Sequence, residues 1–233
     1  NAWLIYWLHD TGVVNDDHRL IAAARRSLDY LMEVLWDDND SGFFQAQQAD
    51  NEYYVTTSTM VPPQVDRIKR ADTNAQAAYV FARLSARSGN SELLDLAVLT
   101  ISALLENHLH GEYFYHAIDE RGPGEISNHP HDIFWTLLAV YEINKLRPGH
   151  VNRQLAATLK RLAIAWVEAQ QYGNTELTAE LAGLVALVIA KSEKGLFREN
   201  AINWALGQLR IDSMTRPDEL VPGLLAWKLH LEN

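Results

Sequence analysis

The sequence predicts an all-α protein of the α/α toroid class, in which inner helices form a ring and outer helices wrap around it. Segments that are apolar on nearly every side alternate along the chain with segments that keep one polar face. Helices of the first kind are buried on both sides, whereas helices of the second kind lie at the surface. The chain is therefore expected to form helical hairpins, each with one inner and one outer helix.

The predicted inner helices cover residues 1–9, 74–88, 133–146, 177–191 and 220–230. A glycine follows each of the first four, at Gly12, Gly89, Gly149 and Gly195. Glycine at these places would end a helix in the left-handed conformation, which it adopts without strain. The spacing between these glycines shrinks along the chain, so the repeat is one of supersecondary structure rather than a strict sequence period.

The predicted outer helices cover residues 19–36, 92–107, 152–170 and 197–209. The third shows the pattern best, with an apolar stripe formed by Leu155, Leu159, Leu162 and Trp166. Two aromatic segments, "DDNDSGFFQ" at 37–45 and "HGEYFYHA" at 110–117, each contain a glycine turn and predict short β hairpins in the connections.

The number of predicted helices is smaller than a complete ring of six hairpins needs, so the toroid is expected to be open or incomplete. A tetratricopeptide-like solenoid also stacks helix pairs. Its regular period of about 34 residues is absent here. Residues 1–233 are interpreted as a single toroid-like domain, and a start at Asn1 rather than Met indicates a processed product, a fragment or a subunit of a longer assembly.

Composition excludes several classes of function. A net charge of −10 has the wrong sign for a nucleic-acid partner. The absence of cysteine excludes disulfides, thiol nucleophiles and Cys-ligated zinc. The longest apolar run, "LAGLVALVIA" at 181–190, has about half the roughly 20 residues that a membrane span requires. A soluble protein is expected, with the cytoplasm the favoured compartment, and no cofactor is predicted.

Three short elements between residues 41 and 90 are similar to motifs of a known family. They are Gln48-Ala49-Asp50, the pair Tyr53-Tyr54, and Asp72-Thr73-Asn74 at the opening of an inner helix. They resemble an Asp-Ala-Asp element, a Tyr-Tyr-x-Trp-Thr strand and an Asp-Trp-Asn helix start in the helical region of the uncharacterised thioredoxin-domain proteins of the spermatogenesis-associated type. The resemblance runs from Asn1 to about Asp212.

The resemblance implies a toroid akin to those of sugar epimerases and six-hairpin glycosidases. It implies no redox activity, because the thioredoxin half with its redox cysteines is missing from this chain. Two motif residues also depart from the family, where Gln48 and Thr73 replace an acidic residue and a tryptophan. The resemblance thus points to a fold and not to a reaction.

Polar residues near the starts of the inner helices are the main candidates for a ligand site. Asn74, Asp132 and Glu180 occupy corresponding positions and would line one cavity, with Asp72 beside them. The alternative, favoured from sequence, is that these residues cap or polarise the first helical turn. Glycoside hydrolysis is a third possibility, because Asp72, Asp132, Glu176 and Glu180 offer carboxyl groups for an acid and base pair.

Histidines cluster in the connection before the third inner helix, at His108, His110, His116, His129 and His131. Imidazoles next to Asp132 would bind a metal, or would move protons as in a sugar epimerase. The His-x-His and His-Pro-His spacings are not those of zinc proteases, so solvated or capping histidines are the favoured interpretation and no metal is predicted.

The aromatic residues and the chain ends suggest a different kind of function. Tyr53, Tyr54, Tyr113, Phe114 and Tyr115 are expected in loops, where aromatic rings bind ligands or partners. An open arc would expose Trp3, Ile5, Trp7, Leu225 and Trp227 as a protein interface.

Two functions follow from sequence. The preferred one is a noncatalytic scaffold or accessory subunit that binds protein partners through this open edge and the loop aromatics. The alternative is a toroid that binds a carbohydrate or small metabolite, as a hydrolase or an epimerase.

Overall fold

The computed structural model describes residues 2–47, 64–172, 177–192 and 196–207. This part of the chain is mainly helical, with α1 (Ala2–Val14), α2 (His18–Tyr30), α4 (Ala71–Ser88), α5 (Ser91–His108), α6 (Pro130–Leu146), α7 (Arg153–Tyr172), α8 (Ala179–Ser192) and α9 (Leu196–Gly207). A π-helical turn, η1 (Leu31–Leu35), continues α2. None of the described helices is both long and apolar enough to cross a lipid bilayer.

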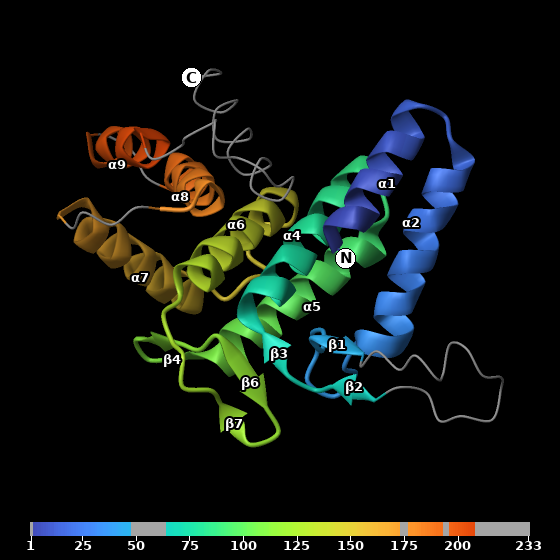
Figure 1. The fold of residues 1–233 in the computed structure, drawn as a ribbon, viewed down its shortest axis with the longest axis horizontal. Coiled ribbons are helices and arrows are strands. Elements are labelled where there is room, and N and C mark those ends of the chain that lie inside the picture. The colour runs from blue at the N-terminus through green and yellow to red at the C-terminus, as the bar shows by residue number, and fades with distance from the viewer. Residues whose placement is uncertain (1, 48–63, 173–176, 193–195, 208–233) are drawn as a thin grey trace.

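The described helices form hairpins that stand side by side in an open arc (Figure 1). Within the hairpins, α1 packs on α2, α4 on α5, α6 on α7 and α8 on α9. Neighbouring hairpins meet through their inner helices, because α4 packs against both α1 and α6, and α6 packs against α8. The predicted alternation of inner and outer helices is therefore confirmed over this part of the chain.

Burial separates the two kinds of helix. The inner helix α4 buries residues on every side, including Ala75, Ala78 and Phe81, and residues 181–189 of α8 are all buried. The outer helix α2 buries only Ala24. The difference follows from the sequence, because a helix that is apolar all round is most stable when protein covers it on all sides.

Short strands cross the connections at one end of the hairpins. They are β1 (Ala46–Gln47), β2 (Val65–Asp66), β3 (Lys69–Arg70), β4 (Leu109–His110), β5 (Tyr113–Phe114), β6 (Ala117–Asp119) and β7 (Gly122–Pro123). All pairings are antiparallel: β1 with β2, β4 with β5, and β6 with both β3 and β7. The predicted aromatic hairpins are present, because an isolated bridge joins Trp36 to Phe43 and the β4–β5 pair spans the second segment.

Two glycine predictions have different outcomes. Gly89 ends α4 with φ of 73°, as predicted. Gly12 does not end α1, which continues to Val14. Gly12 is instead a packing residue, because a Cβ atom there would lie 2.7 Å from Cγ1 of Ile21 in α2. Gly149 has φ of 84° shortly after the end of α6, and Gly195 lies outside the described residues.

The expected exposed edge at α1 is only partly present. Ile5 is 2% exposed and belongs to the core, so its predicted exposure is wrong. Trp3 is half-buried against the rings of Tyr79 and Trp135, and Trp7 remains 47% exposed. Helix α1 packs against both α2 and α4, and Tyr79 of α4 covers part of Trp3. Leu225 and Trp227 lie outside the described residues.

Candidate functional site

Pairing of β3 with β6 brings the starts of two inner helices to one place. Arg70 of β3 lies opposite Ala117 of β6, and the N–H group of Ala71, the first residue of α4, donates to the carbonyl of His116 at 2.8 Å. This bond satisfies one of the free N–H groups at the helix start. It also fixes His116, which directly precedes β6, beside the beginning of α4.

The first turn of α6 enters the same place through a constrained backbone. Asn128 has φ of 56°, and its Oδ1 accepts the N–H of Phe114 at 2.8 Å while its Nδ2 donates to the carbonyl of Glu112 at 3.0 Å. His129 then forms the N-cap, and Pro130 occupies the first turn, where its missing N–H costs nothing. The side chains of His129 and Asp132 consequently project from the start of α6.

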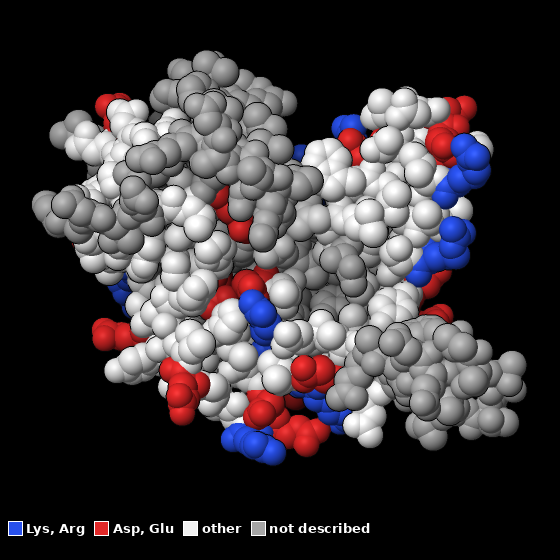
Figure 2. Space-filling view, in the orientation of Figure 1, with Lys and Arg blue, Asp and Glu red and all other residues white. Residues whose placement is uncertain are grey.

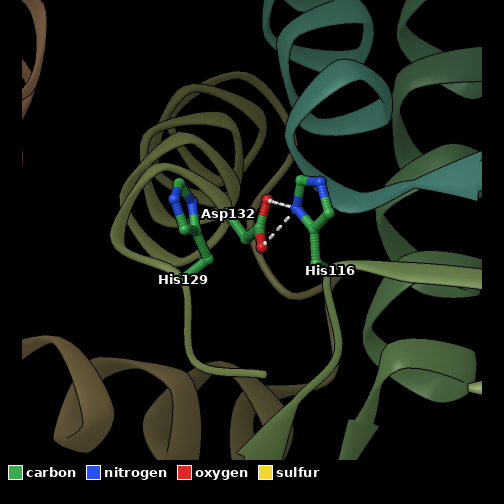
Figure 3. A group of neighbouring side chains, drawn as sticks. All are labelled: His116, His129 and Asp132. Carbon is green, nitrogen blue, oxygen red and sulfur yellow. Dashed lines mark hydrogen bonds and ion pairs between the residues drawn. The ribbon is translucent and has the colours of Figure 1, made fainter. Parts of the chain in front are cut away.

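His116 and Asp132 form a close pair (Figure 3). The Nδ1 atom of His116 lies 2.9 and 3.0 Å from the two carboxylate oxygens of Asp132. An ionised carboxylate only accepts hydrogen bonds, so Nδ1 of His116 carries a proton and Nε2 is the ring nitrogen that does not face the carboxylate. The side chain of Asp132 is 0% exposed and that of His116 is 18% exposed. The protein therefore shields Asp132 from solvent, and its carboxylate holds the imidazole of His116 in place.

Burial raises the pKa of Asp132 to about 6, and the neighbouring imidazole of His116 opposes this rise. The nearby charge of Asp72 raises the pKa further, while that of Arg70 lowers it. A buried carboxyl group is costly to ionise because it has lost its water. Asp132 is thus ionised at neutral pH and becomes protonated in mildly acidic solution.

His129 lies on the other side of the Asp132 carboxylate from His116 (Figure 3). Its ring stacks on that of His131 at 5.3 Å between centroids and is 5.5 Å from that of His116. Although His129 is exposed overall, loss of some solvent and the positive charges of His131 and His116 lower its pKa. A neutral His129 can accept a proton at physiological pH.

His131 connects this cluster to the next inner helix. Its Nε2 lies 3.7 Å from Oε2 of Glu180 in the first turn of α8. Oε1 of Glu180 accepts a hydrogen bond from Nε1 of Trp135 at 3.4 Å. The buried Nδ1 of His131 has no hydrogen-bond partner in the described part of the chain.

Arg70 and Asp72 complete the charged surroundings. Nε and an Nη atom of Arg70 donate to the two oxygens of Asp72 at 3.1 and 2.8 Å. Figure 2 shows acidic and basic side chains together in the recess between the α1–α2 hairpin and the α6 to α9 helices. We define the site as Arg70, Asp72, His116, His129, His131, Asp132 and Glu180.

Asn74 does not belong to this site, although its place in the sequence predicted that it would. It is 3% exposed, and its Oδ1 accepts the N–H of Phe43 at 2.6 Å while its Nδ2 donates to the carbonyl of Phe43 at 2.9 Å. The amide therefore holds the first aromatic hairpin against α4.

The predicted capping roles are confirmed only in part. Oδ1 of Asp72 accepts the N–H of Thr73 at 2.8 Å in the first turn of α4. Asp132 and Glu180 also lie in first turns, where the helix dipole favours a negative charge. Helix α4 begins at Ala71, so Asp72 and Asn74 lie inside it, and neither α4 nor α6 has a side-chain hydrogen bond at its N-cap. Asp132 turns to His116 and Glu180 to Trp135, so these carboxylates serve tertiary contacts rather than the backbone N–H groups of their helices.

Several candidates have other outcomes. Asp50, Tyr53, Tyr54 and Glu176 lie outside the described residues. Phe114 is 0% exposed and so is no surface-binding residue, whereas Tyr113 is 57% exposed. His108 was expected to be solvated or capping, yet it is 2% exposed and its Nδ1 donates to the carbonyl of Tyr115 at 2.8 Å.

Sequence reasoning missed the roles of His116 and Arg70. Each lies at the end of a short connection that looks like an ordinary loop, and only the pairing of β3 with β6 joins them. The histidine cluster was the available signal in the sequence. Its member His116 lies near the end of the predicted hairpin at 110–117 and faces Asp132. His116, His129 and Asp132 also bring potential metal-ligand atoms within 4.8 Å of one another.

Comparison with known proteins identifies the fold. The sequence matches no protein-family profile and no curated protein. A cellobiose 2-epimerase from Spirochaeta thermophila has a similar structure, with a TM-score of 0.66 and 15% identity over 100% of this chain and 73% of the epimerase. The fold is a six-hairpin-glycosidase-like α/α toroid.

Two further toroids are similar over shorter shares of their length. A sugar epimerase from a ruminal bacterium matches with a TM-score of 0.59 and 13% identity, covering 89% of this chain and 57% of that one. A family 76 glycoside hydrolase from a bovine Bacteroides thetaiotaomicron strain matches with a TM-score of 0.53 and 13% identity. The match covers 99% of this chain and 46% of the hydrolase.

The comparisons bear differently on the two functions expected from sequence. The similar toroids are sugar epimerases and a glycoside hydrolase, which agrees with the carbohydrate alternative. The preferred expectation, a scaffold that binds protein partners, receives no support from them. At these identities the likeness establishes the fold, and the chemistry has to be argued from the site.

Proposed function

We propose that this protein binds a reducing sugar and transfers protons at the carbon next to the sugar's carbonyl group, as an epimerase or isomerase. One observation carries the proposal: two imidazoles, His116 and His129, lie on either side of a buried carboxylate at the starts of neighbouring inner helices. Histidine is the residue most often used for proton transfer near neutral pH.

The two rings are suited to different parts of this reaction. His129 has a lowered pKa and is exposed, so it can take the proton from the carbon next to the carbonyl. The electron pair of that C–H bond forms a carbon–carbon double bond, and the π pair of the carbonyl group moves to its oxygen, which gives an enediolate. His116, held by Asp132 through Nδ1, presents Nε2 to a ligand, and the ring protonated at Nε2 gives that proton to the carbon of the enediolate. Return of a proton to carbon gives the epimer or the isomer.

Hydrolysis of a glycosidic bond fits the site less well. A glycosidase needs two carboxyl groups that reach the scissile bond from opposite sides. Asp132 is fully buried behind His116, and both oxygens of Asp72 are bound by Arg70. Glu180 is the accessible carboxylate that remains in the site, at 23% side-chain exposure. The geometry therefore favours imidazole chemistry.

Hydrogen exchange with solvent provides the test. The protein would be incubated in D₂O with glucose, mannose and cellobiose, and deuterium at C2 of the reducing sugar measured by NMR together with the change in configuration. We expect exchange with at least one of these sugars. His116→Gln and His129→Gln should each lower its rate by about 10²-fold or more, as expected for loss of an acid or base.

His150→Gln provides the matched control, because His150 is an exposed histidine in the α6–α7 connection. Its exchange rate should equal that of the wild type. Release of new reducing ends from cellobiose without deuterium at C2 would instead identify a hydrolase. Exchange that persists in both site variants would show that these imidazoles are not the acid and base.

A further inference from the structure

Two imidazoles and one carboxylate in the site have the composition of a metal-ligand set. One potential ligand atom from each of His116, His129 and Asp132 lies within 4.8 Å of the other two. Ligand atoms around a tetrahedral zinc ion lie roughly 3.3 Å apart, given metal–ligand bonds of about 2.0–2.1 Å. Nδ1 of His116 and Oδ2 of Asp132 are already 2.9 Å apart. His129 is exposed and can close the remaining gap by side-chain rotation.

The position between His116 and Asp132 is occupied by a proton that a metal ion can replace. Nδ1 of His116 donates this proton to the carboxylate. A metal ion that binds both groups takes the place of this proton, and the neutral imidazole then carries its single proton on Nε2. The nitrogen and oxygen donors need to separate only slightly, and the backbone of Asp132 is held by its helix, where Oγ1 of Thr136 donates to the Asp132 carbonyl at 2.6 Å.

The surrounding charges favour a cation. Besides Asp132, the site contains the carboxylates of Asp72 and Glu180, and the guanidinium of Arg70 offsets one of them through its contact with Asp72. Imidazole and carboxylate together suit zinc and similar first-row divalent ions rather than calcium or magnesium, which prefer oxygen alone. Three protein ligands would leave the fourth position open.

We propose that His116, His129 and Asp132 bind one divalent ion of the zinc class, and that the bound ion inhibits the proton transfer proposed above. The inhibitory part rests on the proposed function. It follows because the metal occupies a nitrogen lone pair of His129, and because a metal at Nδ1 of His116 leaves the ring proton on Nε2, so neither ring keeps a lone pair that can accept a proton. Metal binding itself requires only the three side chains.

The binding part is tested without sugar. Protein treated with a chelator and then dialysed would be titrated with Zn²⁺ against a chromophoric indicator, and with Co²⁺ while the visible absorption of the ion is recorded. We expect one ion per chain. Calorimetry near neutral pH in buffers of different ionisation enthalpy should detect much less than one released proton per ion, because the proton of His116 moves to Nε2 and stays on the ring.

Variants distinguish this site from ordinary surface histidines. His129→Gln should weaken zinc binding by at least the tenfold to hundredfold that changes around metal ligands typically cost. Its side chain is exposed, so the variant should still fold. Asp132→Asn should weaken binding to a similar extent, and His150→Gln should leave it unchanged. Equal affinity in His129→Gln and the wild type would overturn the proposal, as would an equal loss in His150→Gln.

The inhibitory part is tested by adding one equivalent of Zn²⁺ to the deuterium-exchange assay. Exchange should stop and should return with EDTA. Exchange that continues with zinc bound would refute inhibition and leave the binding site standing. If the protein binds zinc but never exchanges deuterium into a sugar, the proposed function fails, and the inhibition fails with it, while the metal site remains.

Discussion

Phe43 and Asn74 are joined by a reciprocal pair of hydrogen bonds, in which the Asn74 side chain accepts from the N–H group of Phe43 and donates to its carbonyl. The contact ties the first aromatic hairpin to the middle of the inner layer. Phe43 also packs its ring against Phe81 of α4, at 5.7 Å between centroids. An amide that mimics a strand partner in this way is a structural element rather than a ligand contact.

Asn74→Ala should therefore destabilise the protein. The substitution leaves the N–H and C=O groups of Phe43 without partners in a buried place, which costs about 2–4 kcal/mol in unfolding free energy. Urea denaturation measures this change. Asp72→Ala is the comparison, because it removes a partly exposed ion pair with Arg70 and should cost less than about 1 kcal/mol. Equal losses in the two variants would contradict the structural role of Asn74.

Buried His108 should make the fold sensitive to acid. Burial lowers its pKa to about 4 from 6.5. The folded-state pKa lies below that of the unfolded chain, so the stability from a neutral His108 is present above pH 6.5 and is lost as pH falls towards 4. The loss amounts to about 3 kcal/mol. Urea denaturation at about pH 7.5 and about pH 4.5 brackets most of this titration. Between these two pH values His108→Gln should lose less unfolding free energy than the wild type.

His110→Gln serves as the control for His108, since His110 is exposed and close in sequence. It should lose as much stability on acidification as the wild type does. If His108→Gln and His110→Gln behave alike, protonation of His108 does not contribute to acid unfolding.

Asp132 should act in the opposite direction over an overlapping range of pH. Its pKa is raised to about 6 from 3.8, so the folded state binds a proton more readily than the unfolded chain. Its contribution to stability consequently decreases as pH rises from about 4 to about 6, by about 3 kcal/mol in total. Asp132→Asn removes this titration. The stability of the wild type relative to Asp132→Asn should then be lower at about pH 7.5 than at about pH 4.5.

The Asp132 comparison is best repeated in a His116→Gln background, because the His116 imidazole bonds directly to the Asp132 carboxylate. The imidazole opposes the rise in the pKa of Asp132, and its removal should raise that pKa further. The pH dependence assigned to Asp132 should become larger in this background. The chain with Asp132 and its Asp132→Asn variant would be compared at both pH values. If their difference in unfolding free energy is the same at the two pH values, Asp132 is not a buried, proton-binding carboxyl group.

The His129–His131 stack should be visible in an NMR titration. The positive charge of His131 lowers the pKa of His129. In His131→Gln the His129 ring should titrate at higher pH than in the wild type, as its Hε1 resonance would report. His18→Gln is a suitable control because His18 lies in α2 and is surface-exposed. An unchanged midpoint in His131→Gln would show that the two rings do not interact electrostatically.

Two substitutions at Asn128 separate backbone strain from side-chain bonding. Asn128→Gly and Asn128→Ala both remove the hydrogen bonds to Phe114 and Glu112. Only alanine adds the strain of a left-handed backbone, since φ is 56° here. Asn128→Ala should thus be less stable than Asn128→Gly by roughly 1 kcal/mol, measured by thermal or urea unfolding. Equal stability would indicate that the turn changes its conformation in the variants.

The helices were predictable because burial on all sides leaves a mark in the sequence. The continuous apolar run of α8 and the alanine-rich stretch of α4 predicted inner helices, and Gly89 predicted a helix end. The prediction for Gly12 was wrong because glycine also occurs where two helices approach closely, as α1 and α2 do here. Local sequence cannot separate these two uses.

The site was less predictable because its parts come together through non-local pairing. Asp132, His129, His131, Asp72 and Glu180 were named from their positions near helix starts, and the structure gathers them. That reasoning could not show that Asn74 turns away towards Phe43, since both directions are open to the fourth residue of a helix. Nor could it show which of the five clustered histidines meets Asp132, because the position of His116 depends on the pairing of β3 with β6.

The two residues of β3 direct their cations to different places. Lys69 is 6% exposed and reaches Asp37 at 2.6 Å, whereas the next residue, Arg70, reaches Asp72 at the site. Successive side chains of a strand point to opposite faces, so a shift of one residue against β6 would exchange the two. A guanidinium would then enter a space fitted to an ammonium, and the site would lose its arginine. The register of this single short strand decides which carboxylate each cation neutralises.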